Sequence, residues 1–238
     1  MVSKMSKDIS ILMKQIGVAP THSRLILEAM THKSYSTEHG LSYDNQRFEF
    51  LGDAVMQIIL TEYLFMRYPS EQEGKLTKMR SALARQSSFA KLAYALHLQD
   101  FIRMGKGEIA SGGDTRISTL CDAFEALVGA IYMASGLSPV VEIVIPLLKK
   151  HFEDPAALLD DLNPKGMLQE YTQKYCKSER PEYVISMKKG PDHDCEYEIE
   201  VAVKEKVIGR GTGKSRKSAE MAAASNALKA LKQLFEGQ

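Results

Sequence analysis

Residues 45–68 read NQRFEFLGDAVMQIILTEYLFMRY, and this stretch decides the fold of the N-terminal part of the chain. Its apolar residues recur at spacings of three and four, which is the period of an amphipathic helix, and Pro69 follows directly as a breaker. On such a helix Glu49 and Asp53 lie one turn apart on the same face. Two neighbouring carboxylates repel each other unless a partner neutralises them. The stretch therefore predicts a core helix that carries an acidic site.

The helical period continues as far as residue 154. The segments 81–98 (SALARQSSFAKLAYALHL) and 121–136 (CDAFEALVGAIYMASG) repeat the apolar spacing, and glycines lie between them. The following stretch EDPAALLDDLNP is acidic and contains two prolines, which is typical of a linker. We expect an all-α domain over 1–154 and a linker over 155–163.

The period changes after the linker, which predicts a second domain over 164–236. Pro164 suits the first turn of a helix that continues through KGMLQEYTQKYC, and an Ala-rich helix over 215–235 closes the chain. Three strands are predicted between these helices, at 183–187 (YVISM), 195–203 (CEYEIEVAV) and 206–211 (KVIGRG). The expected fold class is an all-α domain followed by a small α+β domain with the order helix, three strands, helix.

Composition narrows the class of protein. Of the 238 residues 44% are apolar, which suits packed globular domains. The three cysteines show no CxxC spacing, so neither a disulfide framework nor a zinc site is supported, and the scattered histidines are expected at the surface or at helix caps. No stretch approaches the roughly 20 uninterrupted apolar residues of a membrane span, and the N-terminus lacks a signal-type apolar core. We expect a cytoplasmic protein with no membrane partner.

Net charge is uneven along the chain. From residue 162 to the end there are 14 Lys/Arg and 11 Asp/Glu, which leaves 17 and 19 for residues 1–161. The C-terminal part is therefore the more basic. A small excess of Lys and Arg is by itself only weak support for a polyanion partner.

A second acidic pair lies on the predicted helix at 121–136. Asp122 and Glu125 are three residues apart and share a helical face. Either pair alone is better explained by Lys or Arg partners or by a solvated helix edge than by a functional site. Two pairs, together with Glu73, favour a hard-cation site, and oxygen-only ligands select Mg²⁺ or Mn²⁺ over zinc. Such an ion supports phosphodiester chemistry, and the absence of a GxxxxGK[ST] loop predicts no nucleotide cofactor.

Three segments together resemble the bacterial ribonuclease III family: 48–55 (FEFLGDAV), 73–84 (EGKLTKMRSALA) and 105–132 (GKGEIASGGDTRISTLCDAFEALVGAIY), and THKS at 31–34 agrees with them. The resemblance implies a Mg²⁺-dependent endonuclease for double-stranded RNA. It also implies a homodimer in which each subunit cuts one strand, so that short 3′ overhangs remain. Ribosomal RNA precursors are the expected substrates, besides messenger and small RNAs.

The same resemblance assigns roles to the acids. Glu73 matches an accessory acid near the dimer interface, and the apolar residues of 48–55 are expected to supply dimer surface. Gln46 stands where the family usually has an outer glutamate, and a glutamine keeps an acceptor oxygen but loses the charge. We expect weaker metal affinity with cleavage retained. The implied metal ligands are Glu49, Asp53, Asp122 and Glu125, of which Asp53 and Glu125 form the catalytic pair.

The C-terminal domain resembles the double-stranded RNA-binding domain in its first helix, in the GPDH turn at 190–193 and in GKSRKSAE at 213–220. Helix N-termini favour phosphate oxygens, and A-form duplexes are gripped by shape, 2′-hydroxyls and phosphates. The acidic face of the strand at 195–203 should point away from RNA. The expected RNA contacts are Gln169, Glu170, His193, Lys214, Ser215, Arg216 and Lys217.

Two other functions stay open on the sequence. A catalytically inactive dimeric protein that only binds double-stranded RNA would explain Gln46, although all four core acids are present. A helical phosphohydrolase for small nucleotides would leave residues 162–235 unexplained.

Overall fold

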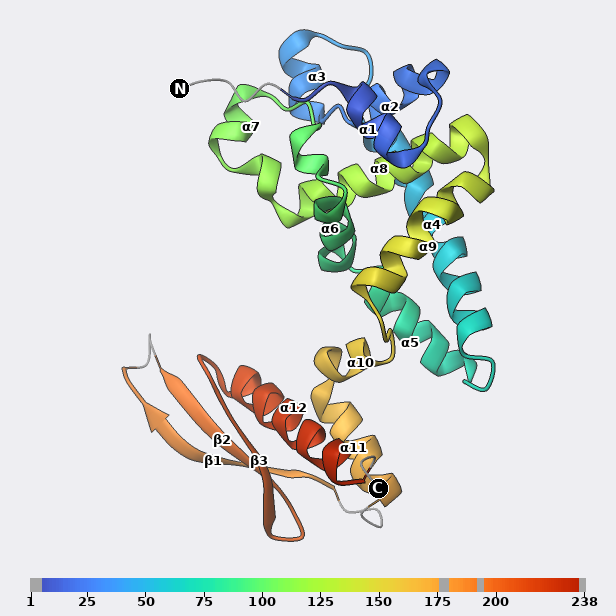
Figure 1. The fold of residues 1–238 in the computed structure, drawn as a ribbon. Helices are drawn as coiled ribbons and strands as arrows, with labels where there is room; N and C mark the ends of the chain where they lie inside the picture. Colours follow the sequence, from blue (N-terminus) through green and yellow to red (C-terminus); the bar gives the residue numbers. More distant parts are fainter. Residues whose placement is uncertain (1–5, 176–179, 192–194, 236–238) are drawn as a thin grey trace. The chain divides into compact units, whose positions relative to one another are not determined.

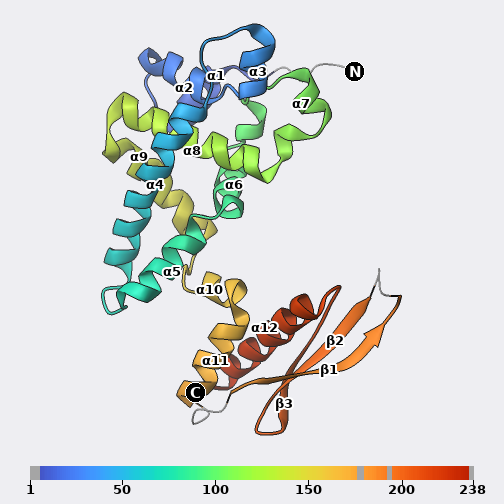
Figure 2. The same cartoon turned by 180° about the vertical axis from the view of Figure 1, so that it is seen from behind.

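A computed structural model describes residues 6–175, 180–191 and 195–235 of the chain. The chain divides into two compact units, Met1–Glu153 and Asp154–Gln238. The first unit is built from helices, and the second combines helices with a three-stranded sheet (Figures 1 and 2). The predicted fold class is thereby confirmed.

Helices of the first unit follow one another through short turns. The two longest, α4 and α8, make its most extensive contact, and α2 and α6 also pack on α8. The helix α4 ends two residues before Pro69, as the sequence predicted. The elements are α1 (Ile9–Ile16), η1 (Pro20–His22), α2 (Ser23–Ala29), α3 (Lys33–His39), α4 (Gln46–Arg67), α5 (Glu73–Leu83), α6 (Gln86–Ala95), η2 (Leu98–Asp100), α7 (Lys106–Ala110), η3 (Gly113–Thr115), α8 (Ile117–Ser135) and α9 (Leu137–His151).

The core of the first unit is apolar and dense around α8. Phe124 of α8 lies against Phe89 of α6 with ring centroids 5.6 Å apart, and both side chains are fully buried. Among the described helices only α8 is long and apolar enough to cross a membrane, but 61% of its most apolar window is buried inside the unit. Such burial is that of a core helix, which is apolar all round because other helices surround it.

The second unit places two helices on one face of an antiparallel sheet with strand order β1-β2-β3 (Figures 1 and 2). The predicted linker contains a short helix, α10, because its apolar Leu159 is buried against the rest of the unit. The elements are α10 (Ala157–Leu162), α11 (Pro164–Tyr175), β1 (Glu182–Lys189), β2 (Glu196–Val203), β3 (Lys206–Gly213) and α12 (Arg216–Phe235).

Glycines on β3 allow α12 to approach the sheet closely. A Cβ atom on Gly211 would lie 2.1 Å from the backbone nitrogen of Ala223, and one on Gly209 would lie 2.7 Å from the Cβ of Ala227. The facing side chains of α12 are the buried Ala219, Ala223 and Ala227. The helix and the strand therefore meet as methyl groups against bare backbone.

Candidate functional site

The two acid pairs meet where α4 packs on α8. Glu49 and Asp53 lie in the N-terminal half of α4, and Asp122 and Glu125 lie on α8. Burial and the charges of Asp53, Asp122 and Glu49 raise the pKa of Glu125 to about 8. Burial, followed by the charges of Asp122 and Asp44, also raises the pKa of Glu49. The structure thus brings together the four carboxylates that the sequence predicted as ligands.

This cluster has the chemistry of a cation site. Within the described residues, no Lys or Arg forms an ion pair with any of its four carboxylates. That arrangement disfavours the simpler explanation of each pair as half of a salt bridge. Grouped acids without basic partners either take up protons or bind a cation. Oxygen ligands from two rigid helices suit a hard divalent ion such as Mg²⁺.

Cys121 lies beside the cluster, which the sequence did not predict. Its Sγ atom and carboxylate oxygens of Asp122 and Glu125 all lie within 4.8 Å of one another. Burial and the charge of Glu125 raise the pKa of the thiol far above its usual range, so the sulfur stays protonated. A cysteine binds metals as the thiolate, so a protonated Cys121 is not a ligand. The carboxylate oxygens remain the ligands, and they favour a hard cation. The spacing of four between Cys121 and Glu125 on one helix was the available signal.

His32 is a second neighbour of the acids. Its Nδ1 accepts a hydrogen bond from the backbone nitrogen of Ser34 at 3.2 Å and caps α3, which fits the expected capping role. Burial raises the pKa of Asp122, and the proximity of His32 opposes that shift. The histidine is therefore close enough to act electrostatically on the cluster.

Two accessory positions behave differently from the core acids. Gln46 is exposed one turn before Glu49, and its backbone nitrogen donates to Oδ1 of Asp44 at 3.0 Å. Glu73 is the first residue of α5 and lines a pocket together with Thr61 of α4. Thr61 lies eight residues after Asp53, which places the two residues about 12 Å apart along the helix axis. Gln46 therefore lies beside the acid cluster, whereas Glu73 lies away from the cluster of its own chain.

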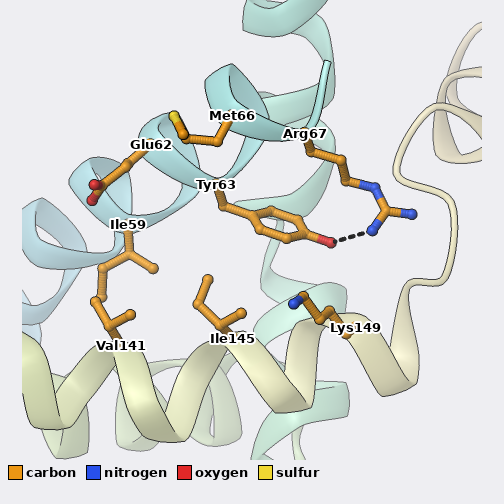
Figure 3. Close-up of a pocket in the computed structure, with 8 residues that line it drawn as sticks. All are labelled: Ile59, Glu62, Tyr63, Met66, Arg67, Val141, Ile145 and Lys149. Carbon is orange, nitrogen blue, oxygen red and sulfur yellow. Dashed lines mark hydrogen bonds between the residues drawn. The ribbon is translucent and has the colours of Figure 1, made fainter. Parts of the chain in front are cut away.

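A separate pocket of about 390 Å³ lies between the C-terminal half of α4 and α9 (Figure 3). Ile59, Val141 and Ile145 form an apolar floor, and Nη1 of Arg67 donates to the hydroxyl of Tyr63 at 3.2 Å. None of the four clustered carboxylates lines it. The pocket is therefore distinct from the acid cluster.

In the second unit, the predicted RNA contacts lie on two helices. Gln169 and Glu170 are exposed on α11. Exposed cationic and hydroxyl side chains gather at the start of α12, at Lys214, Ser215, Arg216 and Lys217. His193 was predicted as a further contact and lies outside the described residues.

Hydrogen bonds fix the start of α12. The backbone nitrogen of Ser218 donates to Oγ of Ser215 at 3.1 Å, and the nitrogen of Ser215 donates to Oγ of Ser218 at 3.0 Å. This is the reciprocal pattern of a capping box. Glu220 pairs with Arg216 at 2.9 Å and with Lys165 at 2.6 Å, which ties α12 to α11. Ser215 therefore serves the cap, and Arg216 is partly engaged within the domain.

On the sheet face that lies away from the helices, strand β2 presents glutamate side chains. Ile199 and Val201 of β2 are buried under the helices, so the alternating Glu198 and Glu200 point the other way. Glu200 pairs with Arg210 of β3 at 2.7 Å. The outer side of β2 thus differs in charge from the start of α12, where Lys214, Arg216 and Lys217 are exposed.

Comparison with known proteins places both units in known families. Residues 22–151 match the model of the family described as "Ribonuclease-III-like", and residues 164–231 match the "Double-stranded RNA binding motif". The chain is 41% identical to the Ribonuclease 3 of Enterococcus faecalis over 230 residues, which cover 93% of this chain and 96% of that protein. It is 39% identical to the Ribonuclease 3 of Anoxybacillus flavithermus, covering 94% of each. The solved nuclease domain of ribonuclease III from Campylobacter jejuni matches with a TM-score of 0.58 and 39% identity, over 62% of this chain and all of that one.

Proposed function

This chain belongs to the ribonuclease III family, and we propose that it is a Mg²⁺-dependent endonuclease that cleaves double-stranded RNA as a homodimer. The observation that carries the proposal is the meeting of two acid pairs with which no Lys or Arg of the described residues forms an ion pair. A double-stranded RNA-binding domain on the same chain supplies the substrate class. Ribosomal RNA precursors, messenger RNA and small RNAs with paired segments are the proposed substrates.

Glu49, Asp53, Asp122 and Glu125 would hold the cation. Bound Mg²⁺ supplies an activated water and neutralises charge at the phosphate, and Mn²⁺ should substitute because it accepts the same ligands. Burial and the neighbouring acids raise the pKa of Glu125 to about 8, and a cation held here would favour its carboxylate form. Asp53 is the most exposed of the four, and Nε2 of Gln57 approaches its Oδ1 at 3.4 Å. Asp53 is thus held on the solvent side, where an RNA strand would approach.

The second unit would hold the duplex by its backbone. Lys214 and Lys217 extend from the N-terminal end of α12, where the helix dipole also favours phosphate. Gln169, exposed on α11, can donate to or accept from a 2′-hydroxyl. These contacts read A-form shape and select RNA duplexes without reading sequence.

Dimer formation is supported by apolar side chains left exposed on α4. Phe50 is 83% exposed, and Ile58 and Phe65 continue the same stripe at 56% and 66%. Met133 of α8 is 60% exposed and lines one pocket together with Phe50. A run of large exposed apolar groups marks an interaction surface. Two copies joined here would present two acid clusters to one duplex, and cuts staggered across the minor groove would leave short 3′ overhangs.

Cleavage of a long, perfectly paired RNA and of its separate strands tests the proposal. The purified full-length protein is incubated with each RNA in Mg²⁺, in Ca²⁺ and in EDTA, beside Glu125→Gln and, as a matched control, the exposed Glu142→Gln of α9. We expect cleavage of the duplex only, in Mg²⁺ only, by the wild type and Glu142→Gln. Cleavage of single strands, or full activity of Glu125→Gln, would contradict the proposal.

One other outcome would favour a different function. If the wild type binds the duplex under all conditions and cuts it in none, the chain is a dimeric RNA-binding protein without catalytic turnover. This alternative function is motivated by the neutral Gln46, which stands where the family usually has an acid. Sedimentation of Phe50→Ser beside the wild type tests the dimer, and an unchanged mass would contradict the proposed interface.

A further inference from the structure

Two glycines bring the backbones of α4 and α8 into direct contact. A Cβ atom on Gly129 would lie 2.2 Å from the carbonyl oxygen of Phe48 and 3.1 Å from the nitrogen of Gly52. A Cβ atom on Gly52 would lie 1.8 Å from the carbonyl oxygen of Glu125. All of these are backbone atoms, which cannot rotate aside as the end of a flexible side chain can. The backbones of the two helices are therefore in direct contact at this level, with no room for a side chain between them.

The contact lies within the acid cluster itself. Gly52 directly precedes Asp53, and Gly129 lies one turn after Glu125. Because the backbone of Glu125 is what Gly52 touches, separating the helices moves Glu125 away from both acids of α4. The helix separation thus fixes the distance between the two pairs.

We propose that Gly129 is a positioning residue that sets the separation of the two acid pairs and, through it, the size of the cation they accept. The inference rests on the proposed metal site. Mg²⁺ requires oxygens at about 2.0–2.1 Å, whereas Ca²⁺ accepts them at about 2.3–2.6 Å in a looser shell. A site whose helices are in direct backbone contact favours the smaller ion.

The size of the effect follows from the contact. With an alanine at 129, the 2.2 Å approach to the Phe48 oxygen must open by about 1.2 Å or more to reach an ordinary non-bonded distance. That opening exceeds the difference between Mg²⁺ and Ca²⁺ ligand distances. A role in core packing alone would instead lower stability and leave the ion preference unchanged.

Cation binding by the full-length protein without RNA tests the proposal. Dissociation constants for Mg²⁺ and Ca²⁺ are measured by calorimetry for the wild type and Gly129→Ala. We expect Mg²⁺ affinity to fall about tenfold or more, as for other changes that misplace ligands, with a clearly smaller change for Ca²⁺. Gly107→Ala on α7, where a Cβ meets nothing within 4 Å, is the matched glycine control. Val144→Ala, a buried site on α9, controls for lost stability, and both controls should keep the wild-type ratio.

The outcomes separate this inference from the proposed function. If the wild type binds neither ion, the proposed metal site itself is refuted. A wild type that binds both, with a Gly129→Ala variant whose two affinities are unchanged or fall equally, overturns the positioning role alone. Circular dichroism of each variant is recorded first. A Gly129→Ala chain that does not fold would also overturn it, since the glycine would then be a requirement of the fold.

Discussion

Replacing Glu125 by glutamine should stabilise the metal-free protein. Burial and three neighbouring acids raise the pKa of Glu125 from 4.5 to about 8. A carboxyl whose pKa is raised by folding contributes stability that is complete below the unfolded value and is lost as the pH rises through the folded value. In EDTA the free energy of unfolding of the wild type should therefore fall between about pH 4.5 and pH 8 because of Glu125. A neutral amide of the same shape has no charge to lose or gain over that range.

The magnitude can be bounded from the same shift. Moving the pKa from 4.5 to about 8 corresponds to at most about 5 kcal/mol. The carboxyl is partly exposed and solvent screens its neighbours, so we expect about 1–2 kcal/mol. For a domain of this size that is a difference of about 2–8 °C in Tm. Glu125→Gln should melt higher than the wild type by this amount at pH 8 in EDTA, and by little near pH 5.

Scanning calorimetry at both pH values, in EDTA and in Mg²⁺, measures the effect. The wild type should gain stability from Mg²⁺ at pH 8, whereas Glu125→Gln should gain little because it lacks a ligand. The exposed Glu142→Gln should follow the wild type throughout. If Glu125→Gln melts below the wild type in EDTA at pH 8, folding does not raise the pKa of Glu125 through burial and the neighbouring acids, and the reasoning is refuted.

Further predictions concern two neighbours of the acid cluster and the start of α12. Gln46→Glu should bind Mg²⁺ more tightly, because a charge is added one turn from Glu49, and calorimetry showing equal affinity would contradict this. In the folded protein Cys121 should resist iodoacetamide at pH 8, since burial raises the pKa of its thiol, and should react once denatured, as peptide mapping by mass spectrometry would show. Lys217→Ala should reduce the salt dependence of duplex binding by about one phosphate contact. Arg216→Ala should reduce it less, because Glu220 already pairs with Arg216, and equal effects would refute that distinction.

Local patterns predicted most of the fold, because each depends only on neighbouring residues. The three-and-four spacing of 45–68 and the alternation of 195–203 predicted α4 and β2 to within a few residues. The short helix α10 was missed because the acidic charge and two prolines of EDPAALLDDLNP are also typical of a linker. What makes that segment helical is the burial of Leu159, which is a property of the folded unit.

The sequence predicted each acid pair of the candidate site, but it could not predict that the two pairs meet. Spacing along one helix paired Glu49 with Asp53, but the meeting of this pair with acids some 70 residues later depends on how α4 packs on α8. That packing rests on Gly52 and Gly129, whose role is visible only when both backbones are in place. The position of Glu73 was not predictable in this way. Its place in the sequence does not reveal that it packs along the C-terminal half of α4, away from the acid cluster.

The glycine and alanine contact between β3 and α12 has a thermal consequence. Methyl groups against bare backbone bury little apolar area for each residue, and the heat-capacity change of unfolding grows with the apolar area exposed. The nuclease domain, whose core is filled by Leu, Met and Phe, should have the larger change for each residue and the more sharply curved stability curve. Cooling should therefore weaken the nuclease domain sooner than the RNA-binding domain, so that in the cold the chain keeps its hold on a duplex longer than its ability to cut it.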